Sequence, residues 1–130
     1  MIGLDTEVLV RFLVQDDPDQ AQRAAECIAR LSEAEPGFVA REVVLELVWV
    51  LAKAYQYNRA HITSALQGLM AAVEIELEDS AVLGAVLDLY ANHGYDFADL
   101  MIRQVGTQRG VSRMVTFDAQ AAQLDGVTLL

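Results

Sequence analysis

Residues 1–13 read MIGLDTEVLVRFL, a short apolar run that leads through an acid into a longer amphipathic run. The first four residues fit a buried β-strand, whereas Val8 and Phe12 belong to an apolar stripe at helical spacing. Asp5 lies between the two, directly after the predicted strand. A strand followed at once by a helix is typical of α/β proteins, so this stretch predicts the fold class.

The same alternation continues along the chain. Further β-like runs are FVA (38–40), AVEIEL (72–77), MVTF (114–117) and VTLL (127–130), each separated from the next by helical patterns. The second helix is expected to begin with Asp17 as its N-cap and Pro18 at its first position. The pattern predicts an α/β fold with a parallel sheet, and 130 residues without a linker predict a single domain over 1–130.

Composition narrows the function classes. The formal net charge of −10 disfavours a protein that binds nucleic acid through a broad basic face, but a nuclease with metal ions in its site remains possible. Cys27 is the only cysteine, which excludes an intramolecular disulfide. Charged residues interrupt the apolar N-terminus, and no apolar run approaches the ~20 residues of a membrane span. We therefore expect a soluble cytoplasmic protein without membrane contact.

One acid stands among hydrophobic residues. Residues 43–52 read VVLELVWVLA, nine apolar residues around Glu46, and their spacing predicts a largely buried helix. A buried ionised carboxylate costs several kcal/mol unless it is paired. Only 9 of 130 residues are Lys or Arg, so arginine partners are scarce. A bound metal ion would compensate the charge.

Three further acids have a comparable setting. Asp5 and Asp118 follow predicted strands, and Asp99 lies in the first turn of a predicted helix. Ligand sites of open α/β sheets form at the carboxyl ends of the strands. Together with Glu46 these acids indicate a divalent-cation site, and oxygen ligands suit Mg²⁺ or Mn²⁺. Helix caps, a helix dipole and an arginine partner for Glu46 are the ordinary alternatives.

Four segments in this order, MIGLDTEVLVRFL, ELVWVL, DFADLMI and VTFD, resemble the PIN-domain ribonucleases, specifically the VapC-type toxins of bacterial toxin–antitoxin pairs. The resemblance covers nearly the whole chain. It implies a three-layer α/β/α fold with a central, mostly parallel sheet of four to five strands. It also implies a metal-dependent endoribonuclease toxin that hydrolyses phosphodiester bonds of RNA and is neutralised by a cognate antitoxin protein.

The resemblance assigns the site residues. Asp5, Glu46, Asp99 and Asp118 would be the catalytic acids that bind Mg²⁺ or Mn²⁺. Accessory residues that orient ligands or water would be Thr6, Asp96 and Thr116. Glu7 departs from the family, which usually has Asn there, and its charge would either hold metal or water or repel the substrate phosphate. A homodimer is expected from the family and from the apolar faces of the helices at 44–55 and 59–71.

Two other functions remain open. An aspartyl-phosphate phosphatase would need a second Asp in place of Glu7 and a lysine near the site, and the only lysine is Lys53. A non-catalytic PIN-like module that binds RNA or protein is favoured by Glu7 and disfavoured by the complete set of four acids. RNA turnover with metal binding separates the enzyme from the binding module.

Overall fold

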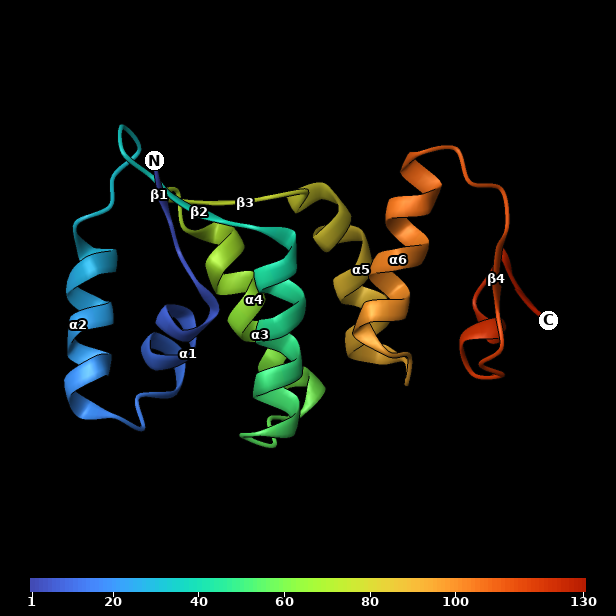
Figure 1. Cartoon of the computed structure of the whole chain (residues 1–130), viewed down its shortest axis with the longest axis horizontal. Coiled ribbons are helices and arrows are strands. Elements are labelled where there is room, and N and C mark those ends of the chain that lie inside the picture. Colours follow the sequence, from blue (N-terminus) through green and yellow to red (C-terminus); the bar gives the residue numbers. More distant parts are fainter. The chain divides into compact units, whose positions relative to one another are not determined.

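Parallel strands and helices alternate along the chain in the computed structural model, which describes residues 1–130 (Figure 1). The elements belong to two compact units, residues 1–80 and residues 81–130. Six α-helices and five strands are present, and every strand pairing is parallel. The predicted α/β class with a parallel sheet is therefore confirmed.

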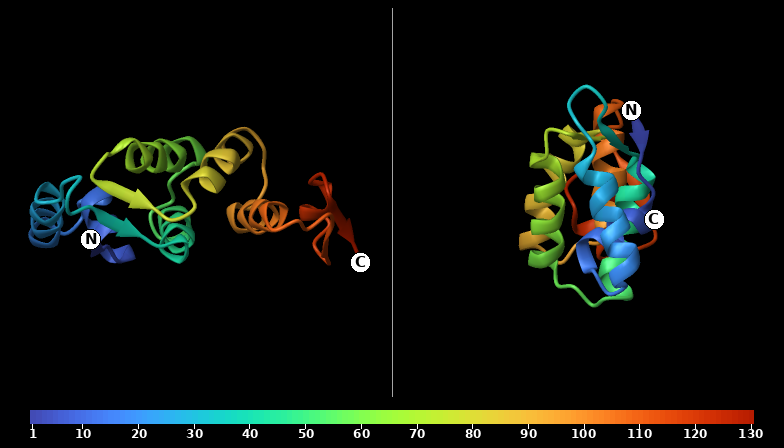
Figure 2. Two further views of the ribbon diagram at one scale, coloured as in Figure 1. Left: turned by 90° about the horizontal axis from the view of Figure 1, so that it is seen from above. Right: turned by 90° about the vertical axis from the view of Figure 1, so that its left-hand side faces the viewer.

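The first unit contains a three-stranded sheet in the order β1-β2-β3, formed by β1 (Ile2–Gly3), β2 (Gly37–Val39) and β3 (Ile75–Leu77). Figure 2 shows these strands side by side. Parallel neighbours cannot be joined by a hairpin and need a long crossover. Helices α1 (Thr6–Val14) and α2 (Pro18–Ala29) connect β1 to β2. Helices α3 (Arg41–Lys53) and α4 (Arg59–Ala71) connect β2 to β3.

The apolar stripes of these helices form the core of the first unit. α1 packs against α2 and α3, and α4 packs against α3 and β3. The fully buried leucine and isoleucine side chains are Leu9, Leu47, Leu51, Ile62 and Leu66. Asp17 caps α2 by accepting a hydrogen bond from the Gln20 backbone N–H, and Pro18 is the first helical residue, as the sequence predicts.

The second unit contains α5 (Ser80–Asn92, which begins at the unit boundary), α6 (Phe97–Gln108), β4 (Met114–Thr116), a 3₁₀ turn (Ala121–Gln123) and β5 (Val127–Leu129). β4 and β5 pair in parallel, with Met114 opposite Val127. Tyr90 of α5 and Phe97 of α6 meet edge to face, with ring centroids 5.3 Å apart. This aromatic contact fixes the end of α5 against the start of α6.

The apolar surface expected on α4 is not found, because Ile62, Leu66 and Leu69 point into the core and the outward positions are polar or small. On α3 a single large hydrophobic residue, Trp49, is exposed. The sequence therefore overestimated the free apolar surface of these two helices. None of the helices has the length and the hydropathy that a membrane span requires.

Candidate metal centre

Asp5 is fixed at the point where β1 gives way to α1. The Leu4 N–H donates to the Phe38 carbonyl at 2.8 Å, which extends the pairing of β1 with β2 by one residue. Asp5 then takes an extended conformation, and its Oδ1 accepts a hydrogen bond from the Thr6 N–H at 2.8 Å. The residue is exposed. Its second carboxylate oxygen has no partner in the protein, so the capping role leaves one oxygen available for a ligand.

Thr6 presents a buried hydroxyl next to Asp5. The residue is 4% exposed, and its Oγ1 has no hydrogen-bond partner. A buried polar atom without a partner is unfavourable by about 1–3 kcal/mol. The accessory role of Thr6 stays a prediction, because the hydroxyl oxygen is closed to solvent in the structure. The free oxygen of the exposed Asp5 carboxylate fits an oxygen-bound cation.

The predicted burial of Glu46 is wrong. It lies in the second turn of α3 and is exposed rather than buried. The buried face of α3 is formed by Val44, Leu47, Val48 and Leu51, and Glu46 lies outside that stripe. No lysine or arginine pairs with it. The burial argument for a metal ion is thus wrong, and a role for Glu46 must rest on its position.

That position is close to the edge of the sheet at which Asp5 lies. α1 and α3 are in contact and begin where the neighbouring parallel strands β1 and β2 end. Glu46 follows the start of α3 by five residues, a rise of about 7.5 Å along the helix axis. The first unit therefore carries two exposed carboxylates, Asp5 directly before α1 and Glu46 on α3, and these two helices pack together.

Two acids of the second unit act on the pKa of a third. Asp96 is the N-cap of α6, and its Oδ2 accepts a hydrogen bond from the Asp99 N–H at 3.3 Å. Partial burial raises the pKa of Asp99, and the nearby charges of Asp96 and Asp118 raise it further. Asp118 lies in a separate sequence motif, and the fold of this unit brings its charge close enough to raise the pKa of Asp99. A divalent cation would relieve this repulsion.

A tight turn after β4 holds Asp118. Its Oδ1 accepts hydrogen bonds from the backbone N–H groups of Gln120 at 2.8 Å and Ala121 at 3.2 Å. Its own N–H donates to Thr116 Oγ1 at 3.0 Å. Thr116 therefore shapes the backbone that presents Asp118. The Gln120 side chain donates to the Gly94 carbonyl at 2.7 Å, which ties this turn to the loop before α6. No sequence signal pointed to Gln120.

The four predicted acids are divided between the units, with Asp5 and Glu46 in residues 1–80 and Asp99 and Asp118 in residues 81–130. Within either unit, no group of three or more His, Cys, Asp or Glu residues could hold a metal ion. The four acids as one site therefore remain a prediction.

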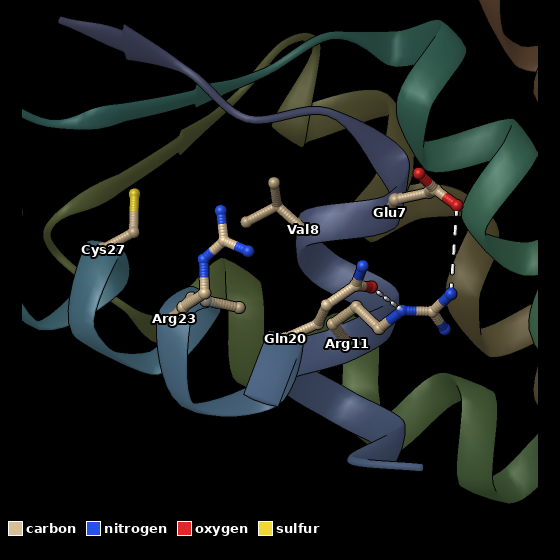
Figure 3. A pocket seen from close by; sticks show the side chains of 7 residues that line it. Glu7, Val8, Arg11, Gln20, Arg23 and Cys27 are labelled. Carbon is tan, nitrogen blue, oxygen red and sulfur yellow. Dashed lines mark hydrogen bonds and ion pairs between the residues drawn. The ribbon is translucent and has the colours of Figure 1, made fainter. Parts of the chain in front are cut away.

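Glu7 lies at a pocket between α1 and α2 (Figure 3). The pocket has a volume of about 360 Å³ and is lined by Glu7, Val8, Arg11, Gln20, Arg23, Ala24 and Cys27. Glu7 Oε1 lies 3.9 Å from the Arg11 guanidinium, which also donates to Gln20 Oε1 at 2.6 Å. Asp5 does not line this pocket. The carboxylate of Glu7, which departs from the family pattern, thus forms an ion pair with Arg11.

We expect Glu7→Asn to leave the affinity for Mn²⁺ within about threefold of that of the parent protein, because Glu7 is exposed and pairs with Arg11 at a pocket that Asp5 does not line. Calorimetric titration of both proteins with Mn²⁺ measures this. A loss of affinity greater than tenfold would instead make Glu7 a ligand. Faster RNA cleavage with an unchanged affinity for Mn²⁺ would indicate that the charge of Glu7 repels the substrate phosphate.

The family model for the PIN domain matches residues 2–127. The chain belongs to the PIN-domain family. This PIN domain is also similar to a curated protein, the VapC ribonuclease of Aquifex aeolicus (strain VF5). The two are 25% identical over 122 residues, which cover 93% of this chain and 90% of the relative. The resemblance that the sequence motifs indicated is confirmed, and with it the assignment of the α/β architecture to the PIN fold.

Proposed function

We propose that this PIN domain is a metal-dependent endoribonuclease, a toxin of the VapC type that a cognate antitoxin neutralises. The observation that carries the proposal is the placement of carboxylates at the carboxyl ends of parallel strands, Asp5 after β1 and Asp118 after β4. A match to the PIN family over residues 2–127, which include parts of both units, supports a single PIN domain. The similarity to a VapC ribonuclease supports RNA as the substrate.

In this proposal Asp5, Glu46, Asp99 and Asp118 would hold Mg²⁺ or Mn²⁺, and the bound metal would supply an activated water and neutralise charge on the phosphate oxygens. The protein residues have separate tasks. One carboxylate oxygen of Asp5 accepts a hydrogen bond from the Thr6 N–H, and the other would bind the metal ion. Thr6 would orient a ligand or a water, as the family resemblance implies. Asp96 and Thr116 would act indirectly. Asp96 accepts a hydrogen bond from the backbone N–H of Asp99, and Thr116 accepts one from the backbone N–H of Asp118.

Electrostatics makes this activity dependent on the cation. The chain carries a formal net charge of −10, and the acids of the site add a local negative field that repels RNA. The antitoxin partner and a homodimer belong to the same proposal and rest on the family resemblance. Trp49 is the exposed large hydrophobic residue that α3 could contribute to either partner.

The test is cleavage of a single-stranded RNA by the purified protein. We expect cleavage with Mn²⁺ or Mg²⁺, none with chelator, and recovery when excess Mn²⁺ is added back, because the carboxylates alone repel the phosphate. Gel separation of end-labelled RNA gives the rate. RNA binding without cleavage at any metal concentration would support the non-catalytic binding module. Cleavage that continues in chelator would contradict a metal-dependent enzyme.

A further inference from the structure

Three polar side chains join α1 to the segment that follows α3. The Tyr55 hydroxyl donates a hydrogen bond to Asp16 Oδ2 at 2.8 Å and accepts one from Arg11 Nη1 at 3.2 Å. Arg11 Nη1 also donates to Asp16 Oδ1 at 3.3 Å. We call Arg11, Asp16 and Tyr55 the Tyr55 network. All three residues belong to the first unit, although Tyr55 is 44 residues from Arg11 and 39 residues from Asp16.

The backbone holds Arg11 and Asp16 in defined positions. Arg11 lies in α1, and its carbonyl accepts a hydrogen bond from the N–H of Gln15, which ends the helix in a left-handed conformation with φ 60°. On the other side of Asp16, Asp17 begins α2 as its N-cap. The Arg11 guanidinium is also oriented by Gln20, whose Oε1 accepts a hydrogen bond from Nε at 2.6 Å (Figure 3). Arg11 and Asp16 therefore form a fixed donor and acceptor pair.

The Tyr55 network lies on the two helices that position the acids of the first unit. Arg11 follows Asp5 by six residues, a rise of about 9 Å along α1. Glu46 lies on α3, and Tyr55 follows the end of that helix by two residues. α1 and α3 pack together, but apolar contacts are not directional. Hydrogen bonds have a defined geometry, so the network fixes the register of α3 against α1.

We propose that Tyr55 is a positioning residue, which sets the place of Glu46 relative to Asp5 through Arg11 and Asp16. The inference rests on the proposed function, in which both acids hold the metal ion. A displacement of about 1 Å in catalytic groups, even from a distant change, can lower a rate by about 100-fold. A hydroxyl that fixes the register of two helices therefore affects catalysis without contact to the metal or the substrate.

Tyr55→Phe tests this role, because it removes the hydroxyl with both of its hydrogen bonds and keeps the aromatic ring. We expect kcat for RNA cleavage with Mn²⁺ to fall by about 5- to 50-fold, with KM within about threefold of the parent value. Calorimetric titration should show an affinity for Mn²⁺ that is weaker by at least about threefold. The matched control is Tyr57→Phe, which makes the same change where the ring stacks on His61 and should leave kcat and affinity unchanged.

A stability control and a double-mutant cycle separate positioning from a general loss of stability. Asn58→Ala removes the N-cap of α4 and should lower the melting temperature without lowering kcat or the affinity for Mn²⁺. Asp16→Ala removes a partner of the Tyr55 hydroxyl, and its effect on kcat should not add to that of Tyr55→Phe, because residues of one network are coupled. Asp16→Asn keeps one acceptor oxygen and should lower kcat less than Asp16→Ala.

The outcomes distinguish this inference from the proposed function. If the parent protein cleaves RNA and Tyr55→Phe retains its kcat and its affinity for Mn²⁺, the positioning role is wrong and the nuclease assignment stands. Additive effects in the cycle, or an equal loss of kcat in Asn58→Ala, would also overturn the positioning role.

Failure of the parent protein to cleave RNA with Mn²⁺ would overturn the nuclease assignment. The calorimetric titration of the parent protein and Tyr55→Phe alone would then decide whether Tyr55 positions the acids. A parent protein that does not bind Mn²⁺ would overturn both proposals.

Discussion

Alanine at Asp5, Glu46, Asp99 or Asp118 should each lower RNA cleavage by more than about 100-fold and relieve growth arrest when the protein is expressed without an antitoxin. Residues that only hydrogen-bond to metal ligands typically account for 10–100-fold in activity or affinity, so the loss of a ligand should exceed that range. Initial rates on labelled RNA with Mn²⁺, and colony counts at matched expression levels, measure the two effects.

The controls separate lost chemistry from lost folding. Asp5→Ala also removes the cap of α1, a change that costs about 0.5–2 kcal/mol of stability, whereas Asp5→Asn can still cap the helix. Both variants should be inactive, and only the first should melt earlier. Asp19→Ala removes an exposed acid that pairs with Arg23 on α2 and should keep full activity. If Asp5→Ala and Asp99→Ala remain as toxic as the parent, the acids have been assigned wrongly.

Asp99→Asn should raise the melting temperature in chelator. Burial and the charges of Asp96 and Asp118 raise the pKa of Asp99, so ionisation of this side chain destabilises the folded protein. An acid with a raised folded pKa stabilises the fold below its unfolded pKa, and this contribution is lost as the pH rises through the folded pKa. The parent protein therefore lacks this stabilising contribution of Asp99 at neutral pH. The advantage of Asn should be largest at about pH 7 and should shrink towards about pH 4.

The same substitution should weaken the response to manganese. A ligand that binds only the folded state stabilises it by about 2.7 kcal/mol at a hundredfold excess over Kd. We expect the parent to gain this stability with Mn²⁺ and Asp99→Asn to gain clearly less. Asp88→Asn on α5 is the matched control, since it makes the same change at an exposed acid that accepts a hydrogen bond from Asn92. Equal manganese responses in parent and variant would show that Asp99 is not a ligand.

The sequence predicted the order of elements well because local patterns determine them. The segment around Asp5 contains a strand, a cap and a helix within 13 residues, and each has its own signal. Asp17 and Pro18 gave the start of α2 in the same way. Exposure within residues 43–52 could not be predicted. Where nine of ten residues are apolar, the pattern does not reveal which side of the helix faces water, and Glu46 and Trp49 are on that side.

The site was predicted less completely than the fold. Parallel strand ends indicated where Asp5 and Asp118 would lie. The electrostatic coupling of Asp99 to Asp96 and Asp118 depends on how a turn and a helix start are placed in space, and local spacing carries no such information. Gln120 was missed for a related reason, because its partner is the Gly94 backbone carbonyl 26 residues away.

That hydrogen bond between Gln120 and Gly94 has a consequence for motion. Short loops near protein surfaces open locally at much lower free energies than the whole fold. Here the turn that carries Asp118 and the loop that leads into Asp96 are joined, so neither can open without breaking the link to the other. The two segments should fluctuate as one cooperative unit. Breathing of this part of the protein would then displace the acids of α6 and of the turn together, rather than one at a time.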